Sequence, residues 1–182
     1  LKQYAHQLSG GMGQRVLIAL ALAQSPKVII CDEITTALDV TLQVQVLDLL
    51  KELSEKKETT FILISHDIGV ISYFSERVMV MYAGMVVEEG ATSEVLSHPY
   101  HPYTKALLKS VLTPEPGLGV PDTQLGMAYP NPIAPPPGCH FHPRCPRATD
   151  LCKQKAPRHT PIPQGHVACH LHDPETPMYE QE

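Results

Sequence analysis

Apolar residues follow two repeating patterns over the first half of the chain, and together they predict alternating strands and helices. Continuous apolar runs at 28–31 and 60–64 are typical of buried parallel strands. Apolar residues at three- and four-residue spacing predict helices from Ser9 to about Gln24, from Asp39 to about Lys56, and over Ile68–Phe74. This alternation predicts an α/β fold with right-handed crossovers and a mainly parallel sheet.

The pattern changes near residue 98. We expect a hairpin across the Ala83-Gly84 turn, then short helices over 93–96, with Thr92 as N-cap, and over 103–112. Pro26 precedes this point, whereas the rest of the 18 prolines follow it. The expected division is a regular α/β domain at 1–98, a helix and Pro-rich linker at 99–138, a loop-dominated Pro/Cys-rich appendage at 139–172, and a loose acidic tail at 173–182.

Composition narrows the class of protein. The chain has 182 residues, of which 43% are hydrophobic, so a packed core is expected. Its net charge of -5 argues against a nucleic-acid-binding surface spread over the chain, and no nucleic acid is expected as a partner. The longest apolar run, Val16–Ala23, is too short for a membrane helix, and no signal peptide is expected. Because Leu1 stands only a few residues before a functional motif, we expect an N-terminal part to be missing.

Two adjacent carboxylates, Asp32 and Glu33, end the first predicted strand. Open α/β sheets place ligands at the C-terminal ends of their strands, and carboxylates there are costly to desolvate without a cation or reacting group. One interpretation is that Asp32 holds Mg²⁺, directly or through water, while Glu33 polarises an attacking water. The alternative is a strand that ends in two solvated acids. His66 follows the second strand, either as a site residue at the same edge or as a partly exposed capping histidine.

Three glycines follow Ser9 at the start of the first predicted helix: Gly10, Gly11 and Gly13. Ser9 is a good N-cap, whereas each glycine weakens a helix by roughly 1 kcal/mol relative to Ala. Their backbone N–H groups and the Ser9 hydroxyl would form an anion site suited to phosphate oxygens. The alternative is a flexible helix start without a ligand.

Four of the five cysteines lie close together in the second half of the chain: Cys139, Cys145, Cys152 and Cys169. Two disulfides, a zinc site, an iron–sulfur site and unligated structural thiols are all compatible with them. Paired C-x₂₋₄-C knuckles typical of zinc are absent, and the wide spacing suits loops around a larger cluster. Nearby histidines are either spare ligands or solvated loop residues, namely His140, His142, His170 and His172. Cys31 is expected to be a small buried residue of the first strand.

Four motifs occur in an order similar to that of ABC-type ATPases. LSGGMGQR at 8–15 resembles the signature motif, VIICDE at 28–33 the Walker B motif, TALD at 36–39 the D-loop, and SHD at 65–67 the switch-histidine motif. In addition, TTALDVTLQVQVLDLL, HPYT and GCHFHPRCP resemble the ATPase subunits of bacterial dipeptide/oligopeptide importers. The resemblance implies a partial P-loop NTPase core followed by a four-cysteine module. In that subfamily the module can carry a [4Fe–4S] cluster, which moves our expectation from zinc to iron–sulfur.

The resemblance also implies a role for each matching residue, with ATP and Mg²⁺ as cofactors. Asp32 would be the Mg²⁺-associated acid, Glu33 the general base, and His66 the contact to the γ-phosphate. Because ABC domains pair head to tail, Asp39 would lie at the dimer interface. The ATP bound by the partner subunit would contact the signature residues, namely Ser9, Gly10, Gly11 and Met12.

Departures from the family pattern are few, but one motif is missing. Met12 replaces a common Gln, Gly13 a common basic residue, and Ile34 the usual Pro after the catalytic Glu. No GxxxxGK[ST] stretch occurs, so the Walker A loop is missing, as are the upstream glutamine and the aromatic adenine platform. We therefore expect that this piece alone does not hydrolyse ATP.

For the whole protein, the resemblance implies an ATPase subunit that energises import of dipeptides or oligopeptides from the cytoplasmic face of the membrane. The implied partners are a second ABC ATPase subunit, two membrane permeases and an extracytoplasmic substrate-binding protein. Alternatives are an importer of nickel chelates or haem, a soluble ABC ATPase of DNA repair or translation, and a non-catalytic metal or redox module with a degenerate cassette. The intact Asp32, Glu33 and His66 argue against the last.

Overall fold

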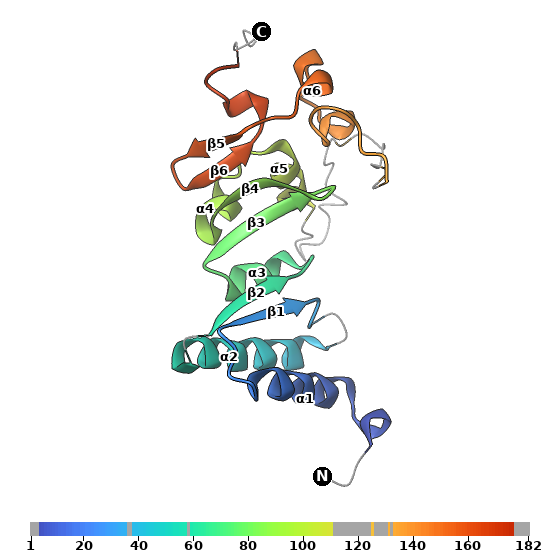
Figure 1. The fold of residues 1–182 in the computed structure, drawn as a ribbon, viewed down its shortest axis with the longest axis vertical. Coiled ribbons are helices and arrows are strands. Elements are labelled where there is room, and N and C mark those ends of the chain that lie inside the picture. Colours follow the sequence, from blue (N-terminus) through green and yellow to red (C-terminus); the bar gives the residue numbers. More distant parts are fainter. Residues whose placement is uncertain are drawn as a thin grey trace, which may run out of the picture. The chain divides into compact units, whose positions relative to one another are not determined.

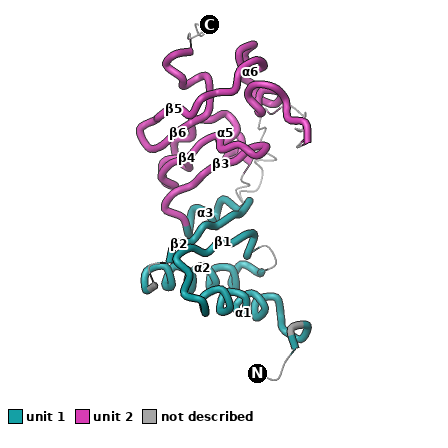
Figure 2. Tube along the Cα trace, viewed as in Figure 1, with its two compact units in different colours: residues 1–74 teal, residues 75–182 magenta. Residues whose placement is uncertain are grey.

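The computed structural model describes residues 4–35, 38–57, 59–110, 125, 131 and 133–176. They belong to two compact units, residues 1–74 and residues 75–182 (Figure 2). Most of the predicted linker, the end of the helix predicted to reach 112, and the tail from 177 onward lie outside the described residues.

In its described residues the first unit contains two parallel strands, three α-helices and one short 3₁₀ helix. In chain order it contains η1 (Ala5–Gln7), α1 (Gly10–Leu22), β1 (Val28–Asp32), α2 (Val40–Lys57), β2 (Thr60–Ile64) and α3 (Ile68–Phe74) (Figure 1). The strands pair in register from Val28↔Thr60 to Asp32↔Ile64. Parallel neighbours need a crossover connection, which α2 supplies. The strands and helices predicted for this part of the chain are confirmed.

Alternate residues of β1 and β2 point to opposite faces of the sheet. One face packs against a core of Cys31, Val46 and Leu50, to which Ile29 and Phe61 add. Cys31 is 4% exposed, as expected of a small buried residue. The other face is exposed in the described residues, with Val28 52%, Ile30 66%, Ile62 49% and Ile64 48% accessible. The expectation of buried strands is therefore met on one face of this sheet only.

Side-chain caps fix the helix starts that the sequence predicted. The Ser9 hydroxyl accepts the Met12 N–H at 3.4 Å, and Asp39 Oδ1 accepts the Leu42 N–H at 2.9 Å. Asp67 Oδ1 accepts the Gly69 N–H at 2.8 Å and so caps α3. Capping side chains satisfy N–H groups that have no partner inside the helix, which is why these helices begin where they do.

The second unit is organised around a four-stranded antiparallel sheet in the order β3-β4-β6-β5. Its elements are β3 (Arg77–Tyr82), β4 (Met85–Ala91), α4 (Thr92–Ser97), α5 (Pro102–Lys109), η2 (His142–Arg144), α6 (Asp150–Gln154), β5 (His159–Ile162), β6 (Gly165–Ala168) and η3 (His170–His172) (Figure 1). Ala83 and Gly84 form the predicted hairpin turn with φ values of 45° and 79°. Positive φ at both positions matches the twist of a two-residue hairpin.

Two expectations about the fold are not met. Among the described strands only β1 and β2 pair in parallel, so a mainly parallel sheet is not confirmed. Strands joined by tight turns, as in β3–β4 and β5–β6, can only be antiparallel neighbours. A loop-dominated appendage is also not confirmed, because β6 of the cysteine-containing segment pairs with β4 through Glu88↔Val167 and Gly90↔Gly165.

Two smaller predictions are wrong. Thr92 does not cap α4, since Ala91 occupies the N-cap position and the buried Thr92 hydroxyl has no partner among the described residues. The tail is not loose at its start: Asp173 is 8% exposed and accepts two hydrogen bonds from Arg158, at 2.6 and 3.2 Å. None of the helices in the described part of the chain is long and apolar enough to cross a bilayer.

Candidate active site

The C-terminal ends of β1 and β2 meet at one edge of the sheet, where both strands are followed by predicted site residues. Asp32 ends β1 beside Ile64, its partner in register at the end of β2. Glu33 follows Asp32, and its backbone N–H donates to the Ile64 carbonyl at 3.0 Å. His66 follows β2 by two residues. The structure thus brings Asp32, Glu33 and His66 to one edge, as parallel pairing requires.

Glu33 and His66 are in direct contact. His66 Nδ1 lies 2.8 Å from Glu33 Oε1, and since an ionised carboxylate only accepts, Nδ1 carries the proton. The hydrogen bond to Glu33 and its negative charge raise the pKa of His66, with a smaller contribution from Asp67. Both side chains are open to solvent, 74% for His66 and 41% for Glu33. This contact is what the interpretation of His66 as a site residue expects, and its role in a site stays a prediction.

The backbone of Glu33 is unusual. Its φ is 51°, in the left-handed region that residues with a Cβ rarely adopt. Such a conformation persists only where surrounding contacts hold it, and it is common at functional sites. The position is the one after Asp32, where the chain must turn sharply away from the sheet.

The first turn of α1 holds the residues predicted to bind an anion. The Ser9 hydroxyl accepts the N-cap hydrogen bond of α1, and Met12 is 47% exposed. Gly11 is buried, and a Cβ built on it would lie 3.0 Å from Leu42 Cδ1. Packing therefore also favours glycine at this position, because the missing side chain lets α1 approach the start of α2. Asp39, expected at a dimer interface, serves in the described chain as the N-cap of α2.

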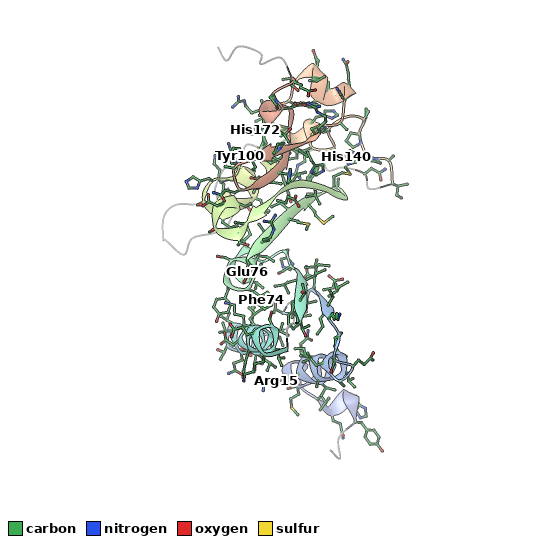
Figure 3. The ribbon with its side chains drawn as sticks, turned by 60° about the vertical axis from the view of Figure 1, so that its left-hand side comes forward. Arg15, Phe74, Glu76, Tyr100, His140 and His172 are labelled. Carbon is green, nitrogen blue, oxygen red and sulfur yellow. The ribbon has the colours of Figure 1, made fainter. Side chains whose placement is uncertain are left out.

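Two contacts of α1 were not predicted from the sequence. Gln14 Nε2 donates to the carbonyl of Ile34, the residue after Glu33. Arg15, labelled in Figure 3, donates from Nη2 to Gln45 Oε1 of α2 at 2.6 Å. A polar side chain on a helix carries no pattern that reveals its partner, so no signal in the sequence could have identified either contact.

The cysteines predicted to bind a cluster are free thiols: Cys139, Cys145, Cys152 and Cys169. Burial raises the pKa of Cys145 to about 11 and that of Cys169 to about 12, although backbone N–H groups donate to both sulfurs. The other thiols of the segment add to both shifts, so the four lie within electrostatic reach of one another.

The structure does not support the expected [4Fe–4S] cluster or its zinc alternative. Within the ranges that the structure describes, no three His, Cys, Asp or Glu side chains are placed to hold a metal ion together. The segment is tied instead by its backbone, with the Cys139 N–H donating to the Cys152 carbonyl at 2.8 Å, and by the buried Phe141. Of the four interpretations, unligated structural thiols fit best.

The four histidines near these cysteines each contact the backbone. One ring nitrogen of each histidine lies 2.8–3.3 Å from a backbone carbonyl oxygen. The four residues are His140, His142, His170 and His172. Because a carbonyl only accepts, the nitrogen in contact carries the proton. These histidines therefore stabilise loops of the second unit through hydrogen bonds to the backbone.

A buried carboxylate organises the HPYHPYT stretch. Glu88 of β4 is 1% exposed and accepts the N–H groups of Tyr100 at 2.7 Å and His101 at 2.9 Å. His101 Nδ1 accepts the Tyr103 N–H at 3.0 Å and so caps α5. Burial, and next the charge of His172, lower the pKa of His101 to about 4. His172 in turn stacks edge-on against Tyr100, and both are labelled in Figure 3.

Comparison with known proteins agrees with both halves of this description. A family model described as ABC transporter matches residues 1–36, and one described as Oligopeptide/dipeptide transporter, C-terminal region, matches residues 87–152. A solved ABC transporter, described as of metal-chelate type and inward-facing, is 32% identical with a TM-score of 0.50, covering 52% of this chain and 38% of its own. The strand-end acids and the glycine-rich helix start thus belong to an ATP-binding cassette of the ABC class.

Curated relatives define the branch. The dipeptide transport ATP-binding protein DppD of Haemophilus influenzae is 46% identical over 178 residues, 98% of this chain and 52% of the relative. The oligopeptide transport ATP-binding protein AppD of Bacillus subtilis is 46% identical over 176 residues, 96% of this chain and 53% of the relative. The chain belongs to the ATP-binding proteins of dipeptide and oligopeptide ABC transporters, and it spans about half the length of the curated relatives it matches.

Proposed function

We propose that the whole protein hydrolyses ATP to drive import of dipeptides or oligopeptides. The observation that carries the proposal is the Glu33–His66 contact at the strand ends, next to Asp32. Relatives that transport dipeptides and oligopeptides support the substrate class. Nickel chelates and haem are the alternatives among importers.

In the proposed reaction Glu33 accepts a proton from the attacking water, or orients it, for in-line attack on the γ-phosphorus. His66 is held by Glu33 on the same edge, where its imidazolium can stabilise charge on the γ-phosphate. Asp32 is exposed and offers carboxylate oxygens, the ligand type that suits Mg²⁺. Bound Mg²⁺ would supply further charge stabilisation for the phosphates.

The rest of the site is proposed to come from a second copy or a sister subunit. Signature residues of one subunit, namely Ser9, Gly10, Gly11 and Met12, contact the ATP bound by the other, with Asp39 at the interface. Two membrane permeases and an extracytoplasmic substrate-binding protein complete the importer. The ATPase lies peripherally on the cytoplasmic face of the membrane. The chain as given lacks a GxxxxGK[ST] loop, so we propose that it is inactive alone.

The test uses the full-length protein assembled with its permeases in vesicles. Glu33→Gln keeps the shape of the side chain but removes the base, so ATP turnover is expected to fall at least about a hundredfold while ATP binding persists. Glu52→Gln, on an exposed face of α2, is the control and retains turnover. Normal turnover by Glu33→Gln, or Glu33-dependent turnover by the isolated chain, would contradict the proposal.

A further inference from the structure

We infer that Gln14 is a positioning residue for Glu33, and that it couples the first turn of α1 to the Glu33–His66 pair. The consequence of this inference for ATP hydrolysis rests on the proposed function, but the geometry of the Gln14 contact is independent of that function. Gln14 lies on α1 and its side-chain amide donates to the Ile34 carbonyl, in a partly buried hydrogen bond that joins segments twenty residues apart.

Glu33 needs such support because its backbone is left-handed. At φ 51° the Cβ is crowded by the neighbouring peptide, and relaxation to a right-handed conformation would swing the carboxylate away from His66. One side of Glu33 is fixed by its own N–H, which donates to the Ile64 carbonyl at 3.0 Å. The other side is fixed by Gln14 through the next carbonyl. The two hydrogen bonds together clamp the strained residue from both ends.

The same helix that holds Ile34 also carries the signature residues. Gly11 lets the first turn of α1 pack against Leu38 and Leu42, with a built Cβ only 3.0 Å from Leu42. Ser9, Gly11 and Gln14 all stand in the first turns of one short helix, which moves as a rigid element. A shift of α1 on contact with a nucleotide would therefore reach Glu33 through the Gln14 amide. Gln14 touches no reacting atom in this arrangement and acts through Glu33.

A matched pair of substitutions tests the inference in the chain itself. Gln14→Leu removes the donor to Ile34, whereas Gln45→Leu makes the same chemical change on α2 and breaks the Arg15 contact instead. Hydrogen exchange measured by NMR reports on the Glu33 amide, and a pH titration of the His66 ring reports on the pair. We expect Gln14→Leu to speed exchange of the Glu33 amide at least about tenfold and to move the His66 pKa toward its ordinary value. Gln45→Leu should leave both unchanged.

Unchanged Glu33 exchange and an unchanged His66 titration in Gln14→Leu would overturn the inference. Gln14→Asn, whose amide is one methylene too short to reach, gives the same answer if Gln14→Leu fails to fold. If Gln14 had only a structural role, both substitutions would change amide exchange evenly across α1 and α2. The Glu33 amide would then not stand out from the others.

A second arm separates this inference from the proposed function. In the full-length transporter, Gln14→Leu should lower kcat for ATP about tenfold with KM unchanged, while Gln45→Leu behaves as wild type. If the wild-type transporter hydrolyses no ATP, the proposed function fails, yet the exchange result still decides whether Gln14 positions Glu33. If the wild type turns over and Gln14→Leu has a normal kcat, the coupling role is refuted.

Discussion

Glu33 and His66, the residues that follow two neighbouring strands, form a hydrogen-bonded pair with 2.8 Å between Oε1 and Nδ1. The pair raises the pKa of His66, first through the hydrogen bond and then through the charge of Glu33. A raised pKa in the folded state means that the interaction is fully present below the ordinary pKa near 6.5 and weakens as pH rises through the folded value.

Replacing Glu33 by Gln should therefore lower the pKa of His66 toward its ordinary value, since a neutral amide stabilises imidazolium less than a carboxylate does. The measurement is an NMR titration of the His66 ring in the two proteins. Glu52→Gln, which changes a charge on the outer face of α2, serves as the control. An unshifted His66 titration in Glu33→Gln would show that the pair does not form in solution.

Two glycines should respond to alanine in opposite directions. A Cβ on Gly165 would lie 2.0 Å from the Glu89 carbonyl oxygen, so Gly165→Ala should break the β4–β6 pairing and destabilise the second unit by about 3 kcal/mol. A Cβ on Gly13 meets nothing within 4 Å, so Gly13→Ala should stabilise the first unit by about 0.5–1 kcal/mol through helix propensity.

Urea unfolding followed by circular dichroism, with amide exchange to separate the units, measures both effects. Equal stability of Gly165→Ala and the parent would mean that β6 is not packed against β4 in solution. A destabilised Gly13→Ala would indicate a contact of the α1 N-terminus that the isolated chain already makes.

The buried His101 predicts a loss of stability on mild acidification. Its folded pKa of about 4 lies below the ordinary value near 6.5, so the unfolded chain binds the proton more readily. Stability is complete above pH 6.5 and is lost as pH falls toward 4, by on the order of 3 kcal/mol. Urea unfolding of the second unit at a series of pH values should show this slope. His101→Gln should flatten it, whereas the exposed His98→Gln should not; an unaltered slope in His101→Gln would assign it to another group.

The thiols of Cys145 and Cys169 should resist alkylation. With pKa values of about 11 and 12, Cys145 and Cys169 hold little thiolate at pH 8, so iodoacetamide should modify them roughly a hundredfold more slowly than in urea. Mass spectrometry of digests measures the extent of alkylation at each cysteine. If the protection is the same with a chelator present, burial and not metal binding causes it. Stoichiometric iron or zinc in the purified protein would contradict the arrangement of thiols described above.

Hydrophobic periodicity was sufficient for the first unit because its elements are regular and capped by local signals. The strands and helices of residues 10–74 lie where the pattern placed them, with Ser9, Asp39 and Asp67 as caps. The second unit was predicted less well. A high proline content suggested loops at 139–172, yet β5 and β6 form there as a hairpin, and β6 pairs with β4, which lies far away in the sequence. Local composition does not record such a partner.

The sequence by itself determined which residues stand at the ends of β1 and β2, and through its motifs it indicated the ABC class. Parallel pairing with a fixed register then leaves little freedom, so Asp32, Glu33 and His66 had to share an edge. Only the tertiary structure decided that Glu33 is left-handed and clamped by Ile64 and Gln14. It also decided that the four clustered cysteines are free thiols, of which Cys169 is buried, without a shared metal-binding geometry in the described residues. Side-chain direction and burial depend on contacts between distant segments, and spacing along the chain does not specify them.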